Sequence, residues 1–348
     1  MSSHQKAIII QAEGVASVVP DAPIPNIRPG YVKVKTVAVA LNPTDWKHID
    51  KYGNPGSLVG CDYAGIVEEV GPNVTKGIQV GDKIAGFAHG ANSNNHEDGA
   101  FAEHIVVNPH IAFKVPDAIS LEEASTLGVG VTTVGQGLYQ SLGLPWPNAP
   151  AEKPFPILIY GGSTATGTLA IQFAKLSGLE VITTCSPHNF DLVKSLGADV
   201  VFDYKSPTVG ADIRKATKDQ LAHVFDCVSE GSSPAIANEA IGSKGGKYST
   251  LLFTEDLPRE DVVTARTLGY IAIGEPFNKF GVEWPRDPAS VEFSTKFASL
   301  TEELLAQGKI KPHPADVREG GLEGVLAGID DLRQGRVSGK KLVYRVGS

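Results

Sequence analysis

The segment ILIYGGSTATGTLAIQFAKLSG, residues 157–178, constrains the fold of this chain more than any other. It reads as a short apolar strand that enters a glycine-rich turn and continues as an amphipathic helix. A helix N-terminus leaves backbone N–H groups free and carries a positive partial charge, so such a turn favours a bound anion. Against the pattern G-x-G-x-x-G, only Gly162 and Gly167 match. The motif alone is therefore weak, and a turn that binds nothing stays open until its surroundings are considered.

Strands and helices alternate regularly after this turn. The predicted strands are Ile157–Tyr160, Val181–Thr184, Val200–Phe202, His223–Cys227 and Tyr248–Leu252, and the predicted helices are Thr168–Leu176 and Phe190–Leu196. Alternation at this spacing predicts βαβ units and a parallel sheet with right-handed connections. This context favours dinucleotide binding over an empty turn.

The end of the second strand indicates which dinucleotide binds. An NAD site usually places Asp or Glu there to hold the ribose 2′-hydroxyl. Here the strand ends in Cys185-Ser186-Pro187-His188-Asn189, and the next acid along the chain is Asp191, inside a helix. A carboxylate would repel a 2′-phosphate, whereas Ser186 and Asn189 can donate to one. Tyr204, which follows the third strand, is placed to close the same pocket, so the sequence favours NADP.

The first third of the chain has a different pattern. Residues 1 to about 125 contain short β-branched or alternating runs separated by Gly, Pro and Asn, and no long helical periodicity precedes Ser120. Ser120-Leu-Glu-Glu123 predicts a helix-capping box. At the other end, an amphipathic helix over 322–332 precedes a strand, Lys341–Val346. A length of 348 residues, at about 150 per domain, agrees with two domains.

Composition excludes several classes of function. The net charge is −8 and no Lys/Arg run occurs, which argues against nucleic-acid binding. No apolar run approaches the ~20 residues of a membrane span. The three cysteines form no C-x-x-C pair, and the apolar run near the N-terminus is too short for a signal-peptide core. These features predict a cytoplasmic protein.

Several runs resemble the medium-chain dehydrogenase/reductase superfamily over nearly the whole chain. They are NPTDWK (42–47), GCDYAGIVEEVG (60–71), VGDKIAG (80–86), DGAFAEH (98–104), GGSTATG (161–167), LGADVVFDY (196–204), FDCV (225–228) and GKKLV (339–343). The runs GLYQSLGLPWP, YGGSTAT and CSPHNFDLVKSLGA are most similar to the zinc-independent fungal branch, which includes trans-acting enoyl reductases that serve polyketide synthases.

The resemblance implies an α/β fold with two domains. A GroES-like β domain, residues 1–125, would be completed by residues 311–348. A Rossmann-type doubly wound parallel sheet would occupy residues 126–310. In this superfamily the active site lies in the cleft between the two.

The same resemblance implies that no metal is bound. Zinc enzymes of the superfamily supply a Cys near the position of Asn42 and a His-Glu pair at Cys61-Asp62. The lobe that holds their structural zinc would fall near residues 87–100, which contain no Cys. Zinc needs about four ligands at close spacing, and this chain does not offer them at those positions.

Without a Lewis acid, a conjugated C=C is the more natural hydride acceptor, because charge delocalises into an enolate. The resemblance implies NADPH-dependent enoyl reduction in fungal secondary metabolism, on an acyl substrate that is free or tethered to a polyketide synthase. Two alternatives stay open, namely a stand-alone quinone or enone reductase and a non-catalytic NADPH-binding protein. Monomer and homodimer are both open.

The resemblance assigns roles by matched position. The expected catalytic residues are Lys47, Tyr52 and Thr133, although a surface lysine and a loop tyrosine are competing interpretations of the first two. The expected cofactor-binding residues are Thr44, Asp45, Trp46, Lys47, Ser163, Thr164, Ala165, Thr166, Ser186, Pro187, His188, Asn189, Tyr204, Leu251, Leu252, Ser338 and Gly339. The expected substrate-contacting residues are Thr133, Gly137, Gln140, Ile273, Gly274, Glu275, Pro276 and Phe277.

Overall fold

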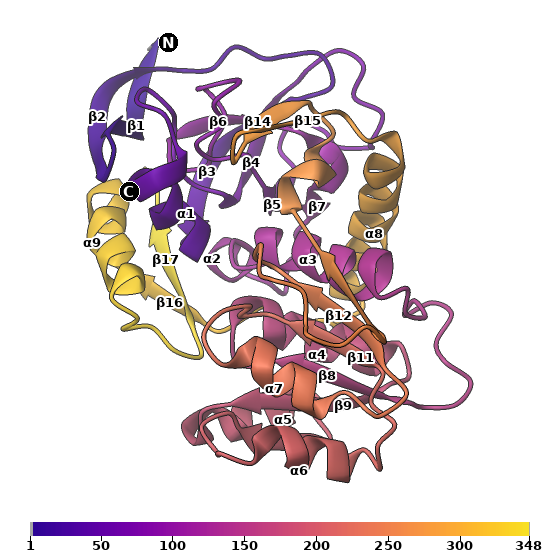
Figure 1. Ribbon diagram of the computed structural model, residues 1–348. Coiled ribbons are helices and arrows are strands. Elements are labelled where there is room, and N and C mark those ends of the chain that lie inside the picture. Colours follow the sequence, from indigo (N-terminus) through magenta and orange to yellow (C-terminus); the bar gives the residue numbers. More distant parts are fainter. Residues whose placement is uncertain (1–2, 348) are drawn as a thin grey trace. The chain divides into compact units, whose positions relative to one another are not determined.

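The computed structural model describes residues 3–347, so residues 1, 2 and 348 of the predicted first domain lie outside the described part. The chain forms two compact units (Figure 1). One contains the residues up to Thr132 and those from Tyr270 onward, and the other is Thr133–Gly269. The α/β fold expected from the sequence is present, with a β-rich unit and a parallel-sheet unit.

A parallel sheet organises the second unit. Within the described residues its six strands are β8 (Pro156–Tyr160), β9 (Glu180–Cys185), β10 (Val200–Asp203), β11 (His223–Asp226), β12 (Gly246–Thr250) and β13 (Val262–Arg266). Their spatial order is β10-β9-β8-β11-β12-β13, and every pairing is parallel. This is the strand order of a dinucleotide-binding Rossmann sheet, with its switch point between β8 and β11.

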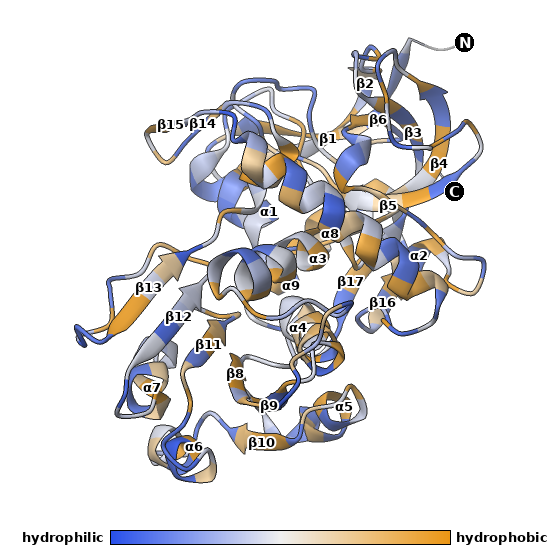
Figure 2. Cartoon of the chain, turned by 90° about the vertical axis from the view of Figure 1, so that its right-hand side faces the viewer, coloured by the Kyte–Doolittle hydropathy of each residue, from blue (hydrophilic) through white to orange (hydrophobic). Residues whose placement is uncertain are grey.

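Helices cover both faces of this sheet. Figure 2 shows α4 (Ala165–Leu176) and α5 (Phe190–Ser195) on one side, and α6 (Val209–Ala216) and α7 (Ser233–Ala240) on the other. All five residues of β8 are therefore buried, as expected for a strand between two helical layers. A π-helix, η3 (Gly135–Ser141), and the short η4 (Pro187–Asn189) complete the unit.

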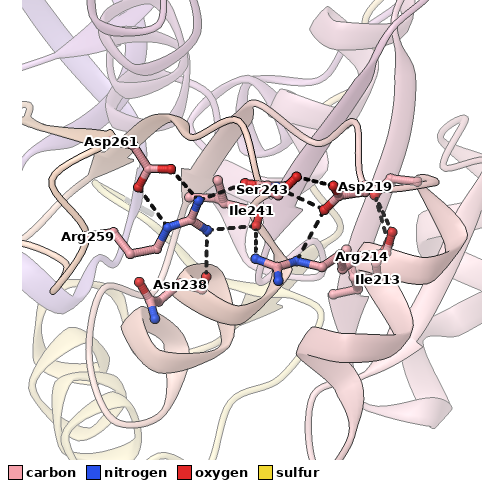
Figure 3. A network of polar contacts seen from close by, with 10 residues as sticks. Ile213, Arg214, Asp219, Asn238, Ile241, Ser243, Arg259 and Asp261 are labelled. Atoms are coloured by element: carbon pink, nitrogen blue, oxygen red, sulfur yellow. Dashed lines mark hydrogen bonds and ion pairs between the residues drawn. The ribbon is translucent and has the colours of Figure 1, made fainter.

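A network of charged and polar contacts holds the loops that lead into β12 and β13, at one edge of the sheet (Figure 3). Arg259, in the loop before β13, donates to the carbonyl oxygens of Ile241 (2.9 Å) and Gly242 (2.8 Å), which follow α7. It also pairs with Asp261 at 2.6 Å. Arg214 of α6 donates to the same Ile241 carbonyl. Both guanidinium groups thus donate to the Ile241 carbonyl, which directly follows the last residue of α7.

The first unit is built on a mostly antiparallel sheet. Its strands are β3 (Val32–Ala40), β4 (Asp62–Val70), β5 (Lys83–Phe87), β6 (His104–Val107), β7 (Phe113–Lys114), β16 (Ala315–Arg318) and β17 (Lys341–Arg345). The order is β16-β17-β3-β4-β5-β7, with β6 also paired to β3. Two hairpins accompany it, β1 (His4–Ala12) with β2 (Val15–Pro23), and β14 (Phe277–Lys279) with β15 (Val282–Trp284).

Short helices join these strands. They are α1 (Pro43–Lys47), the π-helix η1 (His48–Tyr52), η2 (Pro109–Ile111), α2 (Leu121–Ala124) and η5 (Gly269–Ile273). Longer helices are α8 (Pro288–Ala306) and α9 (Gly321–Arg333), and α3 (Gly128–Val134) carries the boundary between the units. The predicted capping box is present, since the Ser120 hydroxyl accepts from the Glu123 amide and Glu123 accepts in return. Because β17 pairs with β3, the C-terminal strand completes the first unit.

The observed boundary differs from the predicted one at residue 310. The structure assigns residues 270–310 to the first unit. Helix α8 explains the difference, because Glu302 on this helix accepts from the Lys114 amide at 2.9 Å and pairs with Lys76 at 3.7 Å. Both partners belong to the β-rich unit. The sequence pattern gave no sign of these contacts, and the contact between Lys114 and Glu302 joins residues 188 positions apart.

A buried ion pair holds the centre of the first unit together. Asp62, the first residue of β4, is paired with Lys341, the first residue of β17, and the two side chains are 0% and 3% exposed. Asp62 also accepts from the Val129 amide at 2.6 Å and from the Asn42 side chain at 3.0 Å. One carboxylate therefore connects two strands, the residue before α1 and the start of α3.

Replacing Lys341 by Met should lower the free energy of unfolding by about 3–5 kcal/mol, because it leaves the Asp62 charge buried and unpaired. The double variant with Asp62→Asn should recover much of this loss. Urea unfolding of both, with Lys340→Met at the half-exposed neighbouring lysine as control, measures the effect. Equal stability of the two single lysine variants would contradict it.

Candidate functional site

The glycine-rich turn of the second unit has the geometry of an anion site. Gly161 has φ = +79°, a conformation that L side chains rarely adopt. A Cβ on Gly162 would lie 2.0 Å from the Thr183 hydroxyl, and one on Gly167 would lie 2.2 Å from the Gly161 carbonyl oxygen. Each glycine is thus required either by backbone conformation or by close packing of the turn against the sheet.

The first turn of α4 presents free donors. Thr164 is the N-cap, and its hydroxyl accepts from the Gly167 amide at 2.9 Å and donates to the Gly161 carbonyl at 2.8 Å. The amides of Ala165 and Thr166 have no acceptor within the helix, as at any helix start. Ser163, Ala165 and Thr166 are partly exposed. A pyrophosphate fits these donors, whereas the Thr164 hydroxyl is already engaged in holding the turn.

The residues expected at the adenosine end follow neighbouring strands. Ser186 follows β9 and Tyr204 follows β10, next to the turn that follows β8, because the three strands are adjacent and parallel. The Tyr204 ring lies 6.5 Å from that of Tyr160 at the end of β8. Ser186 is partly exposed, Pro187 and His188 are exposed, and Asn189 is buried. The structure therefore brings the predicted turn, Ser186 and Tyr204 to one edge of the sheet.

Sequence reasoning missed one acidic group at this edge. Asp203, the last residue of β10, is in register with Cys185. Burial and the Asp203 charge raise the pKa of the Cys185 thiol to about 11. Asp203 accepts from the Lys205 amide at 3.0 Å, so its carboxylate is held by its own strand end.

On the other side of the switch point, Asp226 organises the strand ends. This buried residue ends β11 and accepts from the amides of Val228 (2.9 Å) and Ser229 (2.8 Å) and from the Tyr248 hydroxyl (2.7 Å). Burial and the neighbouring Asp226 charge raise the pKa of Tyr248. The Ser229 hydroxyl in turn accepts from the Leu251 amide at 2.8 Å. The predicted cofactor residues Leu251 and Leu252 thus follow β12 in a positioned loop.

The expected catalytic residues lie in different surroundings. Lys47 ends α1, and its Nζ lies 5.6 Å from the Trp46 ring centroid. Tyr52 is 39% exposed and contacts Phe280 edge-on at 5.0 Å between ring centroids. Thr133 is partly exposed in α3 and belongs to the second unit.

The expected substrate-contacting residues differ in how far they are exposed to solvent. Gly137 is buried in η3, and a Cβ there would lie 2.2 Å from the Phe225 ring, so this glycine serves close packing against β11. Gln140, Glu275 and Pro276 are exposed, whereas Ile273, Gly274 and Phe277 are buried. Glu275 accepts from the Tyr31 hydroxyl at 3.2 Å. Ser338, which is exposed, and Gly339, with φ = +67°, lie between α9 and β17 in the first unit.

The donor chemistry near Asn42 does not suit zinc. The side-chain amide of Asn42 already donates to the Asp62 carboxylate, and this carboxylate also pairs with Lys341. Burial raises the pKa of the Cys61 thiol well above its usual value, so the thiolate that zinc requires is disfavoured. Across residues 3–347, no group of three or more His, Cys, Asp or Glu is arranged to hold a metal ion.

A buried polar cluster in the first unit was not predicted as a site. Thr44, His48, Cys61, His89, Tyr270 and Lys279 form it. The Tyr270 hydroxyl lies 2.9 Å from the Thr44 hydroxyl and 3.8 Å from the Cys61 sulfur, and the His89 ring stacks on Tyr270 at 4.3 Å. Only Thr44 was a predicted site residue, because the others have no motif spacing that sequence reasoning can detect.

Comparison with known proteins identifies the family. The model of the zinc-binding dehydrogenases matches residues 165–249, and that of the GroES-like domain of alcohol dehydrogenases matches residues 28–117. The trans-enoyl reductase ACTTS2 of Alternaria alternata is 50% identical over 98% of this chain and 99% of its own. The chain belongs to the trans-enoyl reductases of the medium-chain dehydrogenase/reductase superfamily.

Other members agree with this placement. The trans-enoyl reductase TOXD of Cochliobolus carbonum is 52% identical over 85% of this chain and 99% of its own. Among solved structures, the CurK enoyl reductase superposes with a TM-score of 0.75 at 18% identity, and each chain is covered to 99%. The quinone oxidoreductase of Coxiella burnetii superposes with the same TM-score at 24% identity and the same coverage. Both structures show the fold that this trans-enoyl reductase shares.

Within residues 3–347, no helix combines the length and apolar character needed to cross a lipid bilayer.

Asp45 makes the stability of this trans-enoyl reductase depend on pH. Its side chain is fully buried. One carboxylate oxygen accepts from the backbone amide of Asn42 at 2.7 Å, and the other has no hydrogen-bond partner among the described residues. Burial raises the pKa of Asp45 to about 7. The folded state therefore holds this proton more tightly than the unfolded state, and the stabilisation present below pH 4 is lost as the pH rises through 7.

Asp45→Asn should remove this contribution. The free energy of unfolding, measured by urea titration from pH 4.5 to 7.5, should fall less steeply with pH in the variant than in the native protein. Asp21→Asn, at an exposed carboxylate, serves as control and should keep the native slope. Parallel curves for native protein and Asp45→Asn would contradict the assignment.

Proposed function

We propose that this protein is an NADPH-dependent, zinc-independent enoyl reductase that saturates an activated C=C bond. The observation that carries the proposal is the 50% identity to a trans-enoyl reductase over 98% of the chain. The Rossmann sheet, its glycine-rich turn and the free amides at the start of α4 supply a place for the cofactor's pyrophosphate. NADPH, when bound, supplies a hydride to the β-carbon of the substrate.

The chain's own residues position and stabilise the reactants. Catalysis without a metal depends on holding the reacting carbons at close range and on donors that stabilise the enolate oxygen. Lys47 and Thr133 are our candidates for such donors, and Tyr52, at a more exposed position, is the weaker candidate for a proton donor. The zinc-independent character is supported by the donor set at Asn42, Cys61 and Asp62.

We infer NADP rather than NAD from the end of β9. Ser186 stands where an NAD site usually places an acid, and Ser186 and Asn189 offer uncharged donors to a 2′-phosphate. Tyr204, beside Lys205, follows the neighbouring strand. Asp203 is an acid at this edge, and its carboxylate accepts from the Lys205 amide.

Ser186→Asp should weaken NADPH binding at least about tenfold, because a carboxylate would face the 2′-phosphate, and should leave NADH binding nearly unchanged. Fluorescence titration with both cofactors measures this shift. Ser195→Asp, which adds the same charge at an exposed position in the same unit, is the matched control. Unchanged NADPH affinity in Ser186→Asp would show that the 2′-phosphate lies elsewhere.

The substrate class we propose is an α,β-unsaturated acyl thioester, tethered to the carrier protein of a polyketide synthase, in the cytoplasm. The family name of the relatives, trans-enoyl reductase, supports an enzyme that acts on a chain held by another protein. The acidic composition, with 39 Asp and Glu against 31 Lys and Arg, gives no support to a nucleic-acid partner.

A substrate panel tests the proposal. The protein with NADPH should oxidise the cofactor in the presence of α,β-unsaturated thioesters, faster with carrier-bound than with free chains, and only slowly with quinones and small enones. Absorbance at the nicotinamide band measures turnover. Fast turnover restricted to free quinones or enones would instead identify a stand-alone reductase. NADPH binding without turnover of any substrate would identify a non-catalytic binder.

A further inference from the structure

Lys279 is a buried lysine without a carboxylate partner. It ends β14 and is 6% exposed. Its Nζ lies 2.5 Å from Nε2 of His48 and 3.8 Å from the centroid of the Tyr270 ring. Among the described residues, no Asp or Glu forms an ion pair with it, unlike Lys341 with Asp62. A buried ammonium is costly unless it is paired, so this placement calls for a functional explanation.

The hydrogen bonds of His48 define the direction of this contact. Its Nδ1 lies 2.6 Å from the Thr44 backbone carbonyl oxygen, which can only accept, so Nδ1 carries the proton. Its Nε2 is then an acceptor and receives a hydrogen bond from the Lys279 ammonium. Burial and the Lys279 charge lower the pKa of His48 to about 3, so the ring is neutral.

The contacts continue from His48 to a partly exposed hydroxyl. Nδ1 of His48 also lies 3.1 Å from the Thr44 hydroxyl, and this hydroxyl lies 2.9 Å from that of Tyr270. Thr44 is only partly buried, whereas Lys279, His48 and Tyr270 are buried. The series Lys279–His48–Thr44 therefore connects an enclosed ammonium to a hydroxyl at the edge of the cluster.

We propose that Lys279, acting through His48 and Thr44, is the proton source that completes reduction of the C=C bond. The inference rests on the proposed function. Hydride addition to the β-carbon leaves an enolate, whose α-carbon must gain a proton. The Thr44 O–H breaks as the α C–H forms, Thr44 regains a proton from His48 Nδ1, and Lys279 passes one to Nε2 and becomes a neutral amine. Lys279 then takes this proton back from Nε2 while solvent protonates Nδ1 through the partly exposed Thr44 hydroxyl, which restores the starting tautomer of His48. Each turnover therefore consumes one NADPH and one proton.

The charge of Lys279 suits this role. Burial lowers the pKa of its ammonium to about 8, so the group is protonated at neutral pH and releases a proton readily. The titratable groups around it are His48, Tyr270, Cys61 and His89, with Asp45 beyond Tyr270 and Cys61. Burial raises the pKa of both Tyr270 and Cys61 well above their usual values, so these two are weaker acids than Lys279. Burial lowers the pKa of His89, so its ring is neutral and carries no extra proton to donate.

The first test compares variants of Lys279 in the full-length protein with NADPH and an α,β-unsaturated thioester. Lys279→Met should lower kcat about 10²-fold, the usual effect of a general acid, with KM and NADPH affinity within about twofold. Lys279→Arg keeps the charge but cannot release a proton near neutral pH, so it should not restore kcat. Lys76→Met, at a partly buried lysine of the same unit, is the control and should keep kcat.

The second test uses Thr44 and remains informative where Lys279 variants fail to fold. Thr44→Ser keeps a hydroxyl and should keep most of kcat, whereas the isosteric Thr44→Val should lose it about as far as Lys279→Met. Reaction in D₂O should place deuterium on one face of the α-carbon in the native enzyme and on both faces in Lys279→Met and Thr44→Val.

The pH profile gives a third readout. The native kcat/KM should be constant below about pH 8 and decline above it as Lys279 loses its proton, and Lys279→Met should lack this decline. Full activity of Lys279→Met or Thr44→Val, or rescue by Lys279→Arg, would overturn the inference while leaving enoyl reduction intact. Absence of native turnover on every thioester would instead contradict the proposed function itself.

Discussion

The buried pair of Asp62 and Lys341 is the interaction on which the first unit depends. Its members come from β4 and β17, 279 positions apart, and neither side chain is more than 3% exposed. Such a pair stabilises little relative to apolar side chains of the same size, but breaking it leaves an uncompensated charge. Because Asp62 also holds Asn42 and the start of α3, the pair determines where α1 begins. The position of Thr44 and His48, and hence of the polar cluster, follows from it.

Much of the fold follows from local pattern. The alternation of apolar strands and helices after residue 157 predicts the parallel sheet, and each predicted strand there overlaps an observed one. The Gly161–Gly167 turn and the capping box at Ser120 are local features that short-range chemistry explains. What local pattern does not contain is β13, the β14–β15 hairpin and the placement of α8. Their positions depend on contacts such as that between Glu302 and the Lys114 amide, which join distant parts of the chain.

The candidate site, too, has one part that local sequence pattern predicts and one part that depends on contacts between distant segments. The nucleotide end is built from residues that directly follow successive strands, so the strand order of the sheet brings Ser186 and Tyr204 to one edge, as expected from their sequence positions. The polar cluster is different, because Thr44, Cys61 and Lys279 come from three segments with no common spacing. Burial without a counter-charge marks Lys279, and burial is a property of the fold rather than of the residue's neighbours in sequence.

The two buried lysines of the first unit show how a protein separates structural from reactive charge. Lys341 faces a carboxylate, so its buried positive charge is balanced by a negative charge. Lys279 faces an imidazole, a thiol and an aromatic ring, and no carboxylate among the described residues balances its charge. Burial therefore lowers the pKa of its ammonium, and the proton is released more easily. At two positions where the resemblance places zinc ligands in zinc-dependent relatives, this chain has Asn42 and Asp62, which belong to the first arrangement. The second arrangement, around Cys61 and Tyr270, surrounds the ammonium that we propose as the proton source.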